Sequence, residues 1–80
     1  MEVWISKYAL TQNIYLETVE QNVSNTSMVY RENSSANFHG EGREWHRTQE
    51  GAIAKAEQMR QRKIASLKKS ITKLEKMKFG

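Results

Sequence analysis

The first half of the chain carries short runs of β-branched and aromatic residues, which are typical of strands. Residues 3–10 form one such run, and residues 14–20 form a second in which Ile14, Leu16 and Thr18 alternate onto one face. The polar residues 11–13 between the runs suit a tight connection, because Asn13 tolerates a left-handed backbone. The pattern predicts an antiparallel hairpin.

Two shorter runs follow the predicted hairpin. Residues 27–31 and residues 36–39 are each predicted to form a strand, and the polar segments 21–27 and 33–35 are predicted to be turns. The glycine-rich residues 40–42 end the last run. The segment 1–39 is therefore expected to form a short antiparallel β-sheet of three or four strands.

From Thr48 the hydrophobic period changes from that of a strand to that of a helix. Thr48 suits a helix N-cap, and Glu50 places a negative charge in the first turn, where the helix dipole favours it. No proline follows, and Gly51 is the only glycine before Gly80. We therefore expect one long, basic, amphipathic helix over residues 48–78 and a single α+β domain over residues 1–80.

Apolar residues recur along this helix at steps of three and four, which places them in one narrow stripe. The stripe consists of Ile53, Ala56, Ile64, Leu67, Ile71 and Leu74. From Ile64 onward the spacing alternates between the a and d positions of a heptad. Arg60 and Lys78 interrupt the pattern on either side, so only the distal half of the helix is coiled-coil-like.

The helix is longer than any sheet that this chain can build. Thirty helical residues span about 45 Å, whereas a seven-residue strand spans about 23 Å. Ile53, Ala56 and Met59 are therefore expected to pack on the sheet, while the distal half overhangs. The overhanging half is expected to meet a second copy, because closed symmetric dimers are the commonest oligomers. The residues predicted to form this homodimer are Ile64, Leu67, Ile71 and Leu74.

Charge is distributed unevenly along the chain, which has a net charge of +4. Residues 60–80 carry eight basic side chains against the single carboxylate of Glu75, a net charge of +7. Five basic residues share the helix face opposite the stripe and form a basic ridge: Lys55, Arg62, Lys69, Lys73 and Lys76. The ridge suits an acidic protein surface or phosphates, and a merely solvated face stays an alternative. It carries no aromatic residue that could stack on single-stranded bases.

Composition and motifs argue against catalysis. The chain has no cysteine, and the Gly40–Gly42 turn lacks the Lys-Ser/Thr end of a phosphate-binding loop. His39 and His46 lie seven residues apart, a spacing that matches no common metal-ligand signature. We expect no catalytic residues, no metal and no cofactor. No leader peptide or membrane span is apparent in the sequence, so we expect a cytoplasmic location and no membrane contact.

Two stretches of the chain are similar to known proteins. Residues 4–11 with Ile14 and Glu17, and much of residues 45–76, resemble small phage- and prophage-encoded proteins of unassigned function. The resemblance implies a phage-type accessory protein, and by analogy an anti-CRISPR or other anti-defence inhibitor. Its expected target is a host protein or ribonucleoprotein with an acidic surface in the host cell cytoplasm. The alternatives are a nucleic-acid-binding accessory protein that uses the basic helix face, and a structural part of a larger assembly.

Overall fold

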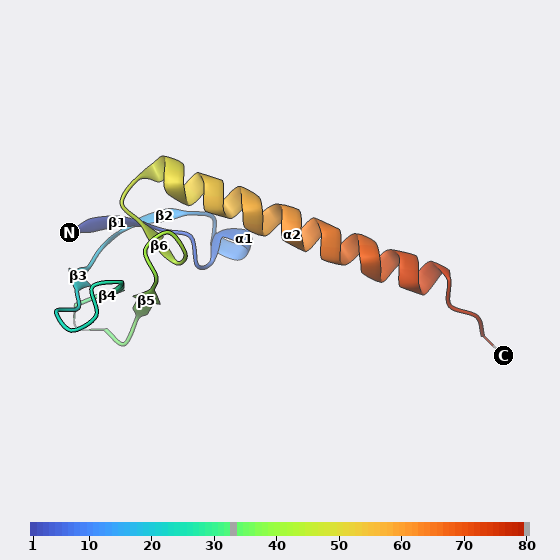
Figure 1. The fold of residues 1–80 in the computed structure, drawn as a ribbon, viewed down its shortest axis with the longest axis horizontal. Helices are drawn as coiled ribbons and strands as arrows, with labels where there is room; N and C mark the ends of the chain where they lie inside the picture. The colour runs from blue at the N-terminus through green and yellow to red at the C-terminus, as the bar shows by residue number, and fades with distance from the viewer. Residues whose placement is uncertain (33, 80) are drawn as a thin grey trace.

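The computed structural model describes residues 1–32 and 34–79, and within them it shows short strands followed by one long helix (Figure 1). The elements in chain order are β1 (Glu2–Ile5), α1 (Ala9–Gln12), β2 (Tyr15–Thr18), β3 (Glu20–Gln21), β4 (Met28–Tyr30), β5 (Asn37–His39), β6 (Trp45–His46) and α2 (Gln49–Glu75). The predicted α+β class is confirmed. We call residues 1–48 the head. The predicted turn over residues 33–35 includes Asn33, which lies outside the described residues.

The strands of the head are divided between two antiparallel sheets of three strands each, in the orders β2-β1-β6 and β3-β4-β5. The predicted hairpin is confirmed, since β1 pairs with β2 in a register that places Glu2 opposite Thr18 and Ile5 opposite Tyr15. Strands β4 and β5 lie within the predicted runs 27–31 and 36–39. The chain leaves the first sheet after Thr18 and enters the second at Glu20, which splits the predicted strand 14–20 in two.

The predicted strand over residues 3–10 ends early, at Ile5, because the chain turns into the short helix α1. The Gln12 N–H donates a hydrogen bond to the Tyr8 carbonyl (2.7 Å), and the Asn13 N–H donates to Ala9 (3.0 Å). Asn13 then leaves the helix with a φ of 65°, a left-handed conformation that asparagine tolerates. The connection between β1 and β2 is therefore a helical turn and not the tight turn predicted at 11–13.

A single core fills the space between the two sheets. It consists of Val3, Ile5, Val19, Val29, Phe38 and Trp45, all buried. Trp45 is the largest of these side chains, and its indole Nε1 donates a hydrogen bond to the Ser27 carbonyl (2.8 Å). The bond ties the first sheet to the segment that precedes β4 and satisfies the one polar atom that Trp45 buries.

Helix α2 begins as predicted, because the Thr48 hydroxyl accepts a hydrogen bond from the Gly51 N–H (3.1 Å). It ends at Glu75, three residues before the predicted end. Its first turns pack on the head through Ala52, which is fully buried. Ile53 is 47% exposed, so the prediction that it packs on the sheet is wrong. The two residues point about 100° apart, and the smaller Ala52 lets the helix approach the sheet closely.

Beyond α1 the helix projects away from the head (Figure 1). Every described side chain from residue 60 to residue 79 is exposed. The radius of gyration is 17.0 Å, against about 12 Å for a compact domain of this length. The predicted overhang of the distal half is therefore confirmed. No helix in the described part of the chain is both long enough and apolar enough to cross a bilayer.

Candidate functional site

Four of the six stripe residues lie on the overhanging part of α2, and from here on we call these four the aliphatic stripe: Ile64, Leu67, Ile71 and Leu74. Their exposed fractions rise with distance from the head, from 38% at Ile64 through 49% at Leu67 and 54% at Ile71 to 65% at Leu74. The heptad spacing keeps the four side chains in line along the helix. Exposed aliphatic side chains in a row are typical of interaction surfaces, so the aliphatic stripe is a candidate site.

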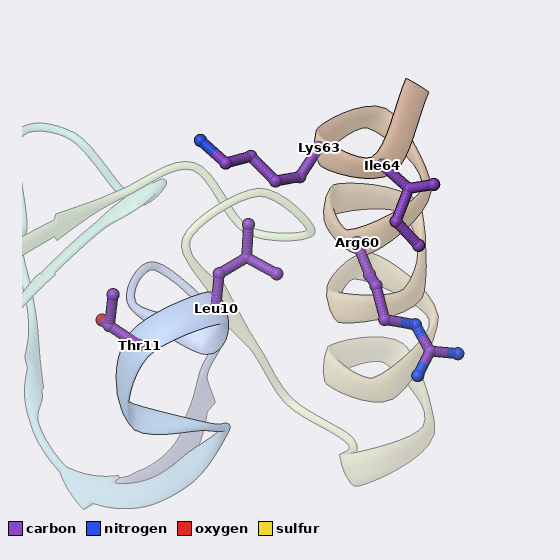
Figure 2. A pocket seen from close by; sticks show the side chains of 5 residues that line it. All are labelled: Leu10, Thr11, Arg60, Lys63 and Ile64. Carbon is purple, nitrogen blue, oxygen red and sulfur yellow. The ribbon is translucent and has the colours of Figure 1, made fainter. Parts of the chain in front are cut away.

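A groove borders the stripe at its head end. Leu10 and Thr11 of α1 line one wall, and Arg60, Lys63 and Ile64 of α2 line the other (Figure 2). The groove has a volume of about 560 Å³, and Leu10 within it is 49% exposed. Lys63 extends from α2 toward the α1 side, so α1 stands beside the stripe and not on top of it (Figure 2). The groove therefore has a mainly apolar lining with the Lys63 side chain beside it, while the Arg60 guanidinium pairs with Glu57.

The structure separates the first residue of the basic ridge from the others. Lys55 is only partly exposed, and its Nζ donates a hydrogen bond to Gln58 Oε1 (3.3 Å). The other four are exposed on the overhanging part of the chain: Arg62, Lys69, Lys73 and Lys76. Among the described residues, the ion pair within α2 is that of Arg60 with Glu57 (2.5 Å), which lies off the ridge. The four exposed cations span about 21 Å of helix without a carboxylate partner in the described chain.

A buried Ser6–His46 pair lies in the head and was not predicted from the sequence. Ser6 Oγ and His46 Nε2 are 2.7 Å apart, and both residues are buried. Because Ser6 Oγ donates its only proton to the Arg43 carbonyl (3.0 Å), it accepts a proton from His46 Nε2. A serine nucleophile needs the opposite arrangement, with the imidazole as acceptor. The pair therefore ties β6 to the residue that follows β1.

The two histidines, His39 and His46, lie in different surroundings. His39 is exposed on β5, whereas His46 is buried between β1 and the start of α2. Within the described residues, no three histidine, aspartate or glutamate side chains come together as metal ligands. Glu41 and Glu44 are instead engaged in ion pairs with Arg47 (2.6 Å) and Lys7 (3.6 Å).

The buried imidazole makes the stability of the head depend on pH. Burial lowers the pKa of His46, and the nearby positive charge of Lys55 lowers it further. In the unfolded chain the His46 imidazole has an ordinary pKa of about 6.5. In the folded head its pKa is lower, so the folded state binds the proton less readily. Stability is therefore complete above about pH 6.5 and falls as the pH drops through that value toward the lower folded pKa.

We expect the melting temperature of the wild-type chain to fall between about pH 7.5 and about pH 5.5. Circular dichroism at several pH values would measure this slope. A His46→Gln variant should show a flatter slope, whereas His39→Gln, which removes an exposed imidazole, should keep the wild-type slope. Equal slopes in all three proteins would show that His46 does not control the acid response.

The candidate functional site is thus the overhanging part of α2, with an aliphatic stripe on one face and a basic ridge on another. The groove beside α1 continues the apolar surface toward the head. Comparison of the chain with protein-family models, with curated proteins and with solved structures found no match.

Proposed function

We propose that this protein is a non-enzymatic binding module that pairs with a second copy through the aliphatic stripe and binds an acidic protein surface through the basic ridge. One observation carries the proposal. The side chains of residues 60–75 of α2 are exposed, and the head borders this segment at the groove beside α1, yet the segment keeps one regular aliphatic face and one cationic face. Two exposed faces of different chemistry on one rigid element favour two different contacts.

The aliphatic face supports pairing between two copies. Ile64, Leu67, Ile71 and Leu74 occupy alternating a and d positions, and this spacing is the one that two helices need to interdigitate. The exposed fractions of 38–65% leave about half of each side chain to be covered by a partner. A second copy supplies an identical face and so needs no further component.

The basic ridge supports an acidic protein as the target. Its exposed cations lack ion-pair partners in the described chain, so they are free to meet carboxylates of another molecule. The ridge carries no aromatic or amide side chain that would read or stack on bases. The resemblance to phage proteins supports a host protein or ribonucleoprotein as the target, bound and inhibited in the host cytoplasm as an anti-CRISPR or other anti-defence step.

A charge-reversal variant of the ridge tests the proposal. We expect Lys69→Glu/Lys73→Glu/Lys76→Glu to bind the target at least ~100-fold more weakly, because like charges across an interface cost several kcal/mol. A Lys69→Arg/Lys73→Arg/Lys76→Arg variant keeps the charge and should retain binding. Capture from host lysate identifies the candidate target, and titration of the purified target with the three proteins measures affinity. Equal affinity of all three for the target would contradict the proposal.

Nucleic acid is the second candidate partner, because four unpaired cations on about 21 Å of helix could also follow a phosphate backbone. In that case the wild type binds arbitrary duplex DNA, and affinity falls with salt by a slope of about −0.9 for each phosphate contacted. Tight duplex binding by the wild type that the charge-reversal variant loses would favour this function. Negligible duplex binding at physiological salt would favour the protein target.

A further inference from the structure

The aliphatic stripe alone makes a small interface. Four half-exposed side chains bury on the order of 400 Å² per copy, half of the roughly 800 Å² that each partner contributes to a stable interface. Three further apolar side chains lie near the two ends of the stripe, and all are exposed: Leu10 at 49%, Met77 at 46% and Phe79 at 88%. A stable pair would cover these residues as well.

We infer that the two α2 helices pair antiparallel, with Met77 and Phe79 of each copy lying in the groove between α1 and α2 of the other. The inference rests on the proposed homodimer and specifies its geometry. Antiparallel pairing about a two-fold axis between Leu67 and Ile71 places Ile64 against Leu74 of the second copy. Leu67 then meets Ile71, so all four residues enter complete a–d layers.

The same alignment brings the residues after α2 to the groove. Leu74 of one copy then lies against Ile64, which lines the groove of the other copy, and α2 ends one residue later, at Glu75. Lys63 marks the side of the stripe on which α1 stands (Figure 2). Met77 and Phe79 follow the end of the helix by two and four residues, so they lie within reach of Leu10, where the groove of about 560 Å³ is large enough for an aromatic ring.

Parallel pairing of the two α2 helices would leave the groove without an apolar partner. It would place Lys68 of the second copy next to Lys63, on the side of Leu10, and would leave Met77 and Phe79 far from the groove. It would also bring Lys63 of each copy against Lys68 of the other, giving two like-charge contacts. At the positions that flank the aliphatic stripe within α2, antiparallel pairing gives one like-charge contact, between the two Lys68 side chains, and places Ser70 against Ser70.

Single-cysteine variants distinguish the two arrangements, because the chain has no cysteine of its own. Under mild oxidation Ser70→Cys should form a disulfide-linked dimer, since antiparallel pairing places the two copies of residue 70 side by side. Ser66→Cys is the matched control on the same helix and should stay largely uncrosslinked. Ile64→Cys should also stay uncrosslinked, because antiparallel pairing separates its two copies by about 15 Å along the axis.

Truncating the groove contact tests the placement of Phe79. Phe79→Ala and Leu10→Ala should each weaken the dimer about tenfold, and the double variant should weaken it little further, because the two side chains share one contact. Val23→Ala, which truncates an apolar side chain that is 96% exposed elsewhere in the head, should leave the dimer unchanged. Sedimentation equilibrium would measure the dissociation constants of the wild type and of the four variants.

The outcomes separate the geometry from the proposed function. A wild-type chain that is monomeric overturns both. A dimer that crosslinks through Ile64→Cys and not through Ser70→Cys is parallel, which overturns the inference and leaves the proposed dimer standing. Unchanged affinity of Phe79→Ala and of Leu10→Ala overturns the placement of Phe79 in the groove.

Discussion

The Leu67→Glu/Ile71→Glu variant is expected to be a monomer at concentrations at which the wild-type chain is a dimer. Both side chains lie at the centre of the aliphatic stripe and are about half exposed in a single chain. Pairing would bury the two new carboxylates without partners, at a cost of several kcal/mol each. Since 1.4 kcal/mol is a factor of ten, we expect the dissociation constant to rise at least ~1,000-fold.

Light scattering and sedimentation over a range of concentrations would measure this change. The matched control is Ala65→Glu/Thr72→Glu, which adds the same two charges to exposed positions of α2 away from the stripe. The control should remain a dimer. Tryptophan fluorescence should show a folded head in all three proteins, because the substitutions lie beyond the residues that pack on it. A wild-type monomer at tens of micromolar (roughly 7 kcal/mol of binding) would contradict the proposed dimer.

Replacing Trp45 by alanine is expected to have the largest effect on folding. Trp45 is completely buried between the two sheets, and its indole donates a hydrogen bond to the Ser27 carbonyl. Truncation of a buried tryptophan costs about 3–5 kcal/mol, whereas an 80-residue domain has only about 4–12 kcal/mol of stability in total. We expect Trp45→Ala to be largely unfolded at physiological temperature.

The chain supplies a matched control in its other tryptophan. Trp4 is only partly buried, on the face of β1 that is turned away from the core between the sheets. Trp4→Ala should therefore lower the free energy of unfolding by less than half as much as Trp45→Ala, as measured by urea denaturation. Equal losses would mean that the head is not centred on Trp45. A Trp45→Phe variant keeps most of the volume and should recover much of the stability without the hydrogen bond.

The long helix could be predicted from the sequence because its signals are local and repeated. Thr48 is a cap, no proline interrupts the segment, and the apolar residues keep one period. The regular pattern did not indicate that α2 packs on the head through one face and presents the aliphatic stripe on another. Ala52 packs on the head, but its small side chain adds little to the hydrophobic pattern, so the pattern favoured Ile53 as the core residue.

The short elements of the head could not be predicted from local pattern. Strand β6 is two residues long, too short for any alternation, and it exists because Trp45 and His46 pair with β1, about 40 positions away in the sequence. Helix α1 contains the apolar Ala9 and Leu10, which resemble the end of a strand. The Ser6–His46 pair depends on the same long-range pairing of β6 with β1, so the local sequence around either residue could not predict it.

The junction between the head and α2 has a mechanical consequence. Only Arg47 and Thr48 separate β6 from the helix, and the first turn of α2 is fixed by the Thr48 cap and by the buried Ala52. The helix beyond Ala52 is therefore a lever of about 35 Å, and a rotation of about 10° at Ala52 moves its far end by about 6 Å. A substitution at Ala52 would therefore change the position of the lysines at the far end of α2, although none of those lysines is itself substituted.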